Sequence, residues 1–140
     1  MVRISNLDIL KILIKNSKTP FLEIARVLGV SETAIRKRIR KMEEDGIIRG
    51  YTIDVDPKKM GFEIEAMIGL DTEPEFYMKT IQKLRDMKEV RSLYSSSGDH
   101  MIMMEVWFKN TEELSNFVDS LNSMEGVKRV CPAIIMEKIK

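Results

Sequence analysis

The chain has 140 residues, enough for one ordinary domain or two small ones, and its 44% hydrophobic content suffices to form a core. One cysteine, Cys131, and one histidine, His100, exclude a disulfide within the chain and leave no zinc site of Cys and His ligands, so we expect no metal and no cofactor. Charged residues such as Arg3 and Asp8 interrupt the apolar N-terminal stretch, which is too short for a signal peptide or a membrane span. These features indicate a cytoplasmic protein that makes no contact with a membrane.

Charge is distributed unevenly along the chain. Residues 1–50 contain eleven Lys and Arg against six Asp and Glu, a net charge of +5, whereas residues 51–140 contain twelve against sixteen, a net charge of −4. A basic end that precedes an acidic remainder favours nucleic-acid binding by the first part and a different role for the second.

The first fifty residues predict three short helices. Asn6 is expected to cap a helix that begins at Leu7, and Thr19 to cap a second helix over Pro20–Leu28, with proline at its first position. Gly29 follows directly, which allows the left-handed backbone of a tight turn. Ser31 is expected to cap a third helix that stops at Gly46.

The third helix has one apolar and one basic face. Ile35, Ile39 and Met42 recur at i, i+4 and i+7 and are expected to face inward. The outward face then carries Thr33, Arg36, Lys37 and Arg40. A helix, a tight turn and a second helix with an exposed polar face are typical of a helix-turn-helix. We predict that double-stranded DNA is contacted by Ser31, Thr33, Arg36, Lys37, Arg40 and Lys41. Of these, Arg40 and Lys41 are expected mainly to hold the DNA backbone. A three-helix interaction module with a solvated basic face is the alternative interpretation.

Residues 47–56, IIRGYTIDVD, are rich in β-branched and aromatic side chains and predict a strand that leaves the helical module. Pro57 and Gly61 then indicate a boundary. The predicted organisation is a helix-turn-helix domain over residues 1–50, a connecting strand or linker over 51–61, and a second domain over 62–140.

The second domain predicts strands and helices in the order βαββαβ. Phe62–Asp71 alternates as a half-buried strand, Pro74 opens a helix, and VRSLYSS and HMIMMEVWF form two further strands around an SGD turn. A capping box of Asn110 and Glu113 begins the second helix, and the last strand ends in AIIMEKI. This order predicts a ferredoxin-like α+β domain.

The third strand of this domain is apolar on both faces, so the sheet face that the helices leave bare also needs burial. One face is expected to carry Ile102, Met104, Val106 and Phe108, and the other Met101, Met103 and Trp107. We predict a homodimer in which a second copy of the sheet covers the bare face.

The whole chain resembles the Lrp/AsnC, or feast/famine, family of transcription regulators, most closely an archaeal branch. The resemblance is carried by EIARVLGVSETAIRKRIRKMEEDGII, GYTIDVDPKKMGF, the YSSSGDH turn and the EGV before the last strand. It implies a winged-helix-like DNA-binding domain, a βαββαβ effector and dimerisation domain, and dimers that assemble into octamers. It also implies an amino-acid effector near the Gly-Asp turn, bound by Ser97, Gly98, Asp99 and His100.

The sequence therefore favours a sequence-specific DNA-binding regulator and not an enzyme. Two alternatives stay open at this point. One is an enzyme like the sirohaem decarboxylases, which resemble this family in architecture, and the other is a metabolite sensor that acts through protein partners. Without the resemblance, the Gly-Asp pair between two strands favours an ordinary hairpin turn over an effector site.

Overall fold

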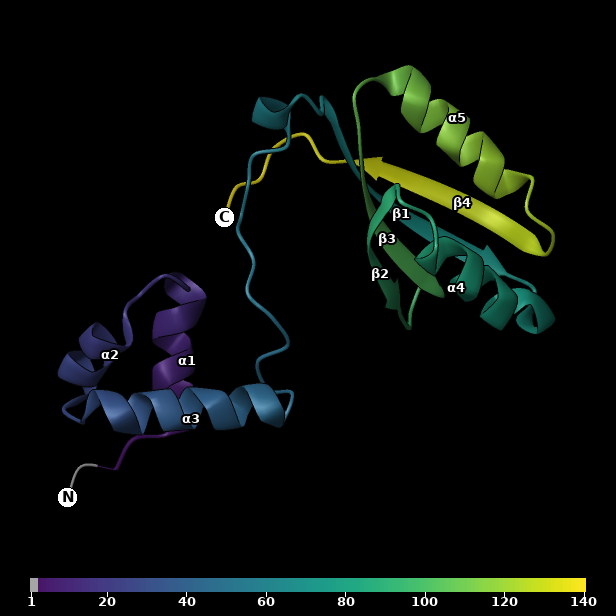
Figure 1. The fold of residues 1–140 in the computed structure, drawn as a ribbon. Coiled ribbons are helices and arrows are strands. Elements are labelled where there is room, and N and C mark those ends of the chain that lie inside the picture. Colours follow the sequence, from purple (N-terminus) through teal and green to yellow (C-terminus); the bar gives the residue numbers. More distant parts are fainter. Residues whose placement is uncertain (1–2) are drawn as a thin grey trace. The chain divides into compact units, whose positions relative to one another are not determined.

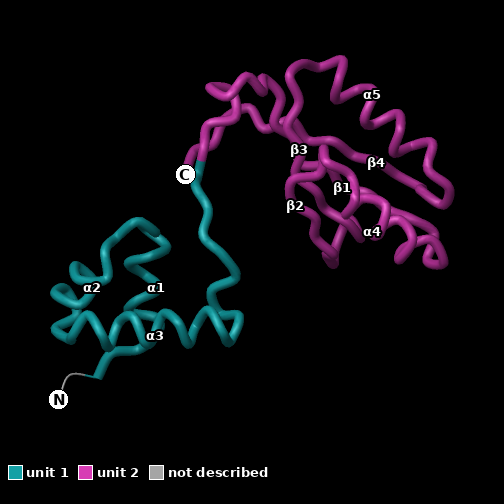
Figure 2. Tube along the Cα trace, in the orientation of Figure 1, with its two compact units in different colours: residues 1–54 teal, residues 55–140 magenta. Residues whose placement is uncertain are grey.

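The computed structural model describes residues 3–140 and divides the chain into two compact units, residues 1–54 and 55–140 (Figure 2). Within the described residues, the first unit consists of three helices and the second of a four-stranded sheet with two α-helices (Figure 1). Within residues 3–140, no helix is both long enough and apolar enough to cross a membrane.

The first unit packs three helices around one core. Helix α1 spans Asn6–Lys15, α2 spans Phe21–Leu28 and α3 spans Glu32–Glu44. Their fully or nearly fully buried side chains form one cluster, made of Ile9, Leu13, Ile24, Ala25, Ile35, Ile39 and Met42. The predicted inward stripe of the third helix is therefore confirmed, and the burial of that stripe fixes which side of α3 faces out.

The caps of the first unit confirm one sequence prediction and correct two. Ser31 Oγ accepts a hydrogen bond from the backbone N–H of Ala34 at 3.1 Å and so caps α3 as predicted. The predicted cap at Asn6 is wrong, because Ser5 and Asp8 form a capping box that starts α1 one residue earlier. Thr19 does not cap α2 either, since its hydroxyl donates to a carbonyl of the preceding turn and the helix begins at Phe21.

The turn between α2 and α3 depends on glycine. Gly29 has a φ of 70°, a conformation that residues with a Cβ rarely adopt. The backbone N–H groups of Gly29 and Val30 both reach back to the carbonyl of Ala25, and this closes the end of α2. The tight turn sets the angle at which α3 leaves α2.

The predicted strand over residues 47–56 is wrong, because the described chain has no strand there. Ile47, Tyr51 and Ile53 are all more than half exposed. A strand needs a neighbour to satisfy its backbone hydrogen bonds, and no other segment of residues 3–140 is paired with this one. High β-propensity alone therefore does not make this segment a strand.

The second unit forms one antiparallel sheet with the predicted element order. Its strands are β1 (Ile64–Thr72), β2 (Val90–Ser95), β3 (Ile102–Phe108) and β4 (Val127–Ile134), and its helices are α4 (Tyr77–Arg85) and α5 (Thr111–Asn122). Short 3₁₀ turns, η1 (Lys58–Met60) and η2 (Pro74–Phe76), precede β1 and α4. The strands lie in the order β2-β3-β1-β4, and every pair is antiparallel. The βαββαβ order and this sheet confirm the ferredoxin-like α+β prediction.

Both helices of this unit cover the same face of the sheet. Leu84 from α4 and Leu121 from α5 share one buried cluster with Ile68 of β1 and Met104 of β3. On the opposite face, Met103 and the other outward side chains of β3 are only half-buried. Met101, predicted to lie on that opposite face, packs against the helix-side core, because it precedes β3 and so lies outside the strand's alternation.

The last strand and the start of α5 differ in detail from the sequence prediction. The last strand runs over Val127–Ile134 and ends before MEKI, although the N–H of Ile135 still donates to the carbonyl of Glu65. Asn110 caps α5 by accepting from the N–H of Glu113, as predicted. The Glu113 carboxylate accepts from Lys109 instead of Asn110, so the capping box is only half formed.

Candidate functional sites

The exposed face of α3 carries the basic residues predicted to contact DNA. Ile35, Ile39 and Met42 are buried, so the opposite side of the helix presents Thr33, Lys37 and Arg40 to solvent. The helix begins at a serine-capped turn, which leaves its N-terminal half free to enter a groove of a duplex.

Arg36 is less available than its sequence position suggests. Its Nη2 lies 2.6 Å from Oε1 of Glu32, one turn earlier on α3. Its guanidinium carbon also lies 5.3 Å from the ring centroid of Phe21 on α2, within cation-π range. The side chain is therefore held at the α2 flank of the exposed face, although it is still about half exposed.

Lys37 and Arg40 differ from Arg36, because neither has a hydrogen-bond or ion-pair partner among residues 3–140. Lys41, in contrast, pairs with Asp45 at 3.1 Å. A groove runs along the side of α3 that carries Lys37 and Lys41. It is lined by Arg3, Ile4, Val30, Ala34, Lys37, Arg38, Arg40, Lys41 and Glu44. Arg38 also lines this groove, and it donates to the carbonyl of Ile4, which ties the N-terminal segment to the helix. The groove is consequently basic and contains a single acidic side chain.

The second cluster of candidate residues lies at the turn between β2 and β3. Ser96 anchors this turn, because its hydroxyl donates to the carbonyl of His100 and its N–H donates to the carbonyl of Met101. Gly98 has a φ of 101°. Asp99 is 83% exposed, whereas the side chain of His100 is only 16% exposed.

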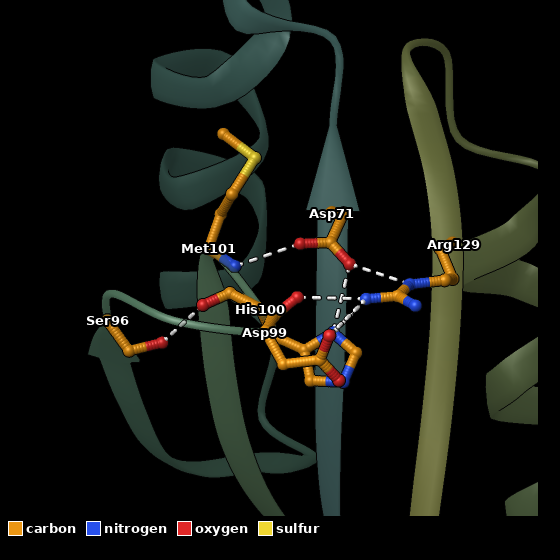
Figure 3. Close-up of polar contacts among 6 residues, drawn as sticks. All are labelled: Asp71, Ser96, Asp99, His100, Met101 and Arg129. Atoms are coloured by element: carbon orange, nitrogen blue, oxygen red, sulfur yellow. Dashed lines mark hydrogen bonds and ion pairs between the residues drawn. The ribbon is translucent and has the colours of Figure 1, made fainter.

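Two residues from other strands join this turn, and Figure 3 shows them beside it. Asp71, near the end of β1, accepts the backbone N–H of Met101 at 2.9 Å through Oδ1. Its Oδ2 lies 2.9 Å from Nδ1 of His100 and 3.0 Å from Nε of Arg129 on β4. Nη2 of Arg129 donates to the Asp99 carbonyl at 2.8 Å and lies 3.3 Å from Oδ1 of Asp99. We call Asp71, Asp99, His100 and Arg129 the turn network.

His100 reaches Asp71 only because residue 69 is a glycine. Gly69 lies in the middle of β1, and a Cβ at this position would overlap the imidazole ring of His100. The ring therefore lies directly on the strand backbone, in space that any other residue would fill.

Hydrogen bonds determine the charge state of the network. Burial alone would raise the pKa of Asp71, but hydrogen bonds from His100, the Met101 N–H and Arg129 outweigh it and hold that pKa below its usual value. An ionised carboxylate only accepts, so the His100 proton that faces Asp71 is on Nδ1. Hydrogen bonds to Asp71 and Asp99 raise the pKa of Arg129.

The structure brings together part of the predicted effector site. Asp99 and His100 contact each other and the other two members of the turn network. Ser97 makes no hydrogen bond among residues 3–140, and Gly98 contributes only its backbone turn. Sequence reasoning missed Asp71 and Arg129. Asp71 is an acidic residue at the end of an otherwise buried strand, and this position could have indicated a polar contact. Arg129 lies 58 residues further along the chain, and nothing in the local sequence indicates that it meets Asp71.

The fold and these sites define a class of protein, namely a DNA-binding regulator with a helix-turn-helix unit and a separate ferredoxin-like unit. Residues 3–49 match the winged helix-turn-helix DNA-binding family, and residues 65–140 match the Lrp/AsnC ligand binding domain. The chain is 50% identical to the HTH-type transcriptional regulator LrpA of Pyrococcus abyssi over 133 residues, which cover 94% of each protein. The chain belongs to the Lrp/AsnC family of transcription regulators.

Solved structures agree with this assignment. Escherichia coli AsnC is 29% identical and superposes with a TM-score of 0.82 over 99% of this chain and 95% of that one. The Neisseria meningitidis regulator NMB0573, solved as a complex with L-Met, has the same TM-score of 0.82, covering 99% of this chain and 93% of that one. At 23% identity, its likeness shows the fold alone. The protein is thus a DNA-binding transcriptional regulator and not an enzyme.

Proposed function

We propose that this regulator binds operator DNA as a homodimer, with α3 of each copy in the major groove, and that a small zwitterion bound at the β2–β3 turn modulates binding. The observation that carries the DNA part is the exposed basic stripe of α3, on which Lys37 and Arg40 have no partner within residues 3–140. Cations without partners are free to neutralise phosphates and release counterions.

Within this proposal the residues of α3 have separate roles. Ser31 and Thr33, at the start of the helix, approach base edges together with Lys37. Arg40 and Lys41 contact the phosphate backbone and set the register of the helix. Arg36 joins them only when it releases Glu32, because the two side chains form an ion pair in the free protein.

The bare sheet face of the second unit supports the homodimer. Met67, Met103 and Trp107 are only half-buried there, and Nε1 of Trp107 is buried without a hydrogen-bond partner among residues 3–140. The Arg91 guanidinium carbon lies 3.4 Å from the Trp107 ring centroid. Glu65 and Glu105 share this face with the apolar side chains, because they alternate in register with Met67, Met103 and Trp107. We propose that the same face of a second copy covers it, and that such dimers assemble further, up to an octamer.

Met103→Lys tests the dimer. A desolvated charge at the centre of the face would oppose association, so light scattering should report a smaller species than for the wild type. Met78→Lys is the matched control, because Met78 lies exposed on α4 and the same substitution there should leave the mass unchanged. An unchanged mass for Met103→Lys would reject this interface.

Operator spacing tests the paired recognition helices. Two α3 helices related by a twofold axis require half-sites about 10 base pairs apart, or a multiple of that. We expect footprinting to show reduced protection when about five base pairs are inserted between half-sites, and partial recovery with about ten. Equal protection for all spacings would leave only a nonspecific basic surface, and a protein that ignores DNA altogether would favour a sensor acting through protein partners.

The effector part of the proposal concerns Ser97, Gly98, Asp99 and His100, together with the remaining members of the turn network. These residues lie in the part of the chain that matches the Lrp/AsnC ligand binding domain. An amino acid is the favoured effector class, because the turn presents an exposed carboxylate for an ammonium group.

Asp99→Ala tests the effector site. We expect it to abolish any amino-acid-dependent change in DNA affinity, measured with the twenty protein amino acids, while DNA binding without effector persists. Asp86→Ala is the matched control, because Asp86 is also an exposed acid, at 78%. Unchanged amino-acid responses in Asp99→Ala would remove the turn from the effector site.

A further inference from the structure

Arg129 is held firmly on one side and loosely on the other. It lies opposite Asp71 in the register of β1 and β4, and its Nε donates to Asp71 at 3.0 Å. Asp71 is itself fixed by the Met101 N–H and by His100, and its side chain is only 17% exposed. The Nε edge of the guanidinium is therefore held by a carboxylate that other hydrogen bonds already fix in place.

At the outer edge of the same guanidinium, Nη2 donates to the Asp99 backbone carbonyl at 2.8 Å and lies 3.4 Å from Nδ1 of His100, but its only carboxylate partner is weak. Nη2 lies 3.3 Å from Oδ1 of Asp99, a side chain that is 83% exposed on a glycine turn. Within residues 3–140, the other terminal nitrogen of Arg129, Nη1, has no hydrogen-bond partner. Solvent screens an ion pair of this kind, and separating the two groups costs little.

We propose that Arg129 is the carboxylate receptor of the effector site. The ligand carboxylate displaces the Asp99 side chain from Nη2 and binds Nη1 and Nη2 of Arg129 together, in the two-pronged geometry that guanidinium groups favour. Asp99, released from Arg129, then accepts the ligand's α-ammonium group. This inference rests on the proposed effector function of the turn and adds the residue that selects a zwitterion.

Charge explains why the site would prefer a zwitterion to a simple acid or a simple amine. Asp71 and Asp99 are opposed by the single positive charge of Arg129, so the network has one excess negative charge when His100 is neutral. A carboxylate without an amine would add a second negative charge and leave Asp99 unpaired. An amine without a carboxylate would draw Asp99 away and leave the outer edge of Arg129 without a partner. Only a ligand with both a carboxylate and an ammonium group gives Arg129 and Asp99 each a new partner of opposite charge.

The experiment uses the full-length protein and isothermal titration with each of the twenty protein amino acids. The tightest binder is then compared with its carboxamide, which lacks the carboxylate, and with its deaminated acid, which lacks the ammonium group. Each compound is titrated into the wild type, Arg129→Gln, Arg129→Lys, Asp99→Asn and the control Lys128→Gln. Lys128 is the neighbouring exposed cation on β4, so its variant removes the same charge at a different place.

We expect wild-type protein to bind the amino acid about tenfold or more tightly than the carboxamide, because the carboxamide cannot form the charged hydrogen bonds to Arg129. Arg129→Gln should weaken binding of the amino acid and bring this ratio close to one, while Arg129→Lys restores part of it. Asp99→Asn should keep the carboxamide ratio and lose discrimination against the deaminated acid. Lys128→Gln should behave as the wild type.

Two outcomes would overturn the inference in distinguishable ways. If Arg129→Gln keeps the wild-type preference for the amino acid over its carboxamide, Arg129 is not the receptor, although the effector proposal stands. If the wild type binds none of the twenty amino acids, the effector proposal itself is wrong, and this inference falls with it. Circular dichroism of each variant shows whether the fold is intact, and the Arg129→Lys arm retains the cation should Arg129→Gln unfold.

Discussion

The charged groups of α3 and those of the turn network are organised on opposite principles. On α3 each ion pair joins residues one helical turn apart, as in Glu32 with Arg36 and Lys41 with Asp45, and all of these side chains are substantially exposed. In the turn network a single carboxylate, Asp71, receives hydrogen bonds from residues 29, 30 and 58 positions away in the sequence.

This difference has a physical consequence. Local pairs on an exposed helix contribute only a few tenths of a kcal/mol and exchange readily with another anion such as a phosphate. A half-buried carboxylate with three donors is costly to disturb, because each donor would be left without an acceptor. We therefore expect substitutions on α3 to change DNA affinity and leave stability almost unchanged, and substitutions at the turn network to change stability first.

The largest expected effect comes from removing Lys37 and Arg40, which line the exposed face of α3 and have no partner within residues 3–140. Lys37→Ala combined with Arg40→Ala should cost about 2 kcal/mol or more in DNA binding, since a side chain that reads a base contributes about 1 to 3 kcal/mol. Fluorescence anisotropy at several salt concentrations should also show a log-log salt slope that is shallower by roughly 0.9 for each phosphate that is no longer neutralised.

The control for this variant is Lys11→Ala combined with Lys18→Ala. It removes the same charge from exposed positions outside α3. If both double variants weaken binding equally, net charge and not the exposed face of α3 governs affinity.

Gly69→Ala should produce the next largest effect. We expect it to lower the stability of the fold and not the affinity for DNA. The added methyl group would overlap the imidazole of His100, so we expect a loss of about 1 to 3 kcal/mol in the free energy of unfolding by chemical denaturation. Gly50→Ala is the matched control, because a Cβ there meets no atom within 4 Å. In a His100→Ala background the cost of Gly69→Ala should largely disappear, and persistence of the full cost would show that the strand backbone, not His100, resists the methyl group.

The same contrast explains how far the sequence could predict this molecule. The inward stripe of α3, the Ser31 cap and the βαββαβ order follow from local patterns, and the structure confirms them. The strand predicted over residues 47–56 failed because a strand depends on a neighbour, which no local pattern supplies.

The two candidate sites also differ in whether local sequence patterns predict them. The exposed face of α3 was predictable because helical periodicity places its residues. Periodicity alone does not show the Glu32 contact that restrains Arg36. The roles of Asp71 and Arg129 were not predictable, because only the pairing of β1 with β4 brings them opposite each other.

The pH dependence of stability offers a third and smaller test. The folded-state pKa of Asp71 is held below its unfolded value of about 3.9, so its contribution to stability is fully present above that pH and is lost as pH falls through the folded-state pKa. The free energy of unfolding of the wild type should therefore fall more steeply below about pH 4 than that of Asp71→Asn. Asp8, whose pKa is also lowered, is present in both proteins, so the difference between the two curves isolates Asp71. Parallel curves would mean that Asp71 contributes no linkage.

The smallest effect should come from releasing Arg36. Glu32→Gln removes the 2.6 Å ion pair on α3, which is worth about 0.2 to 0.5 kcal/mol to the helix, and it also removes one negative charge beside the proposed DNA surface. Because Arg36 then has no carboxylate to leave, we expect operator affinity to rise by at most about 0.5 kcal/mol, close to twofold.

A double-mutant cycle with Arg36→Ala decides what this small change means. If Arg36 contacts DNA after leaving Glu32, Arg36→Ala should cost more in the Glu32→Gln background than in the wild type, by about the energy of the ion pair. Comparing the operator with scrambled DNA then separates the two kinds of contact, because a base contact contributes affinity only on the operator and a phosphate contact contributes it on both. If Arg36→Ala costs nothing in either background, Arg36 serves to pack against Phe21 and hold α2 to α3, and Lys37 and Arg40 carry the DNA contacts from the middle of the helix.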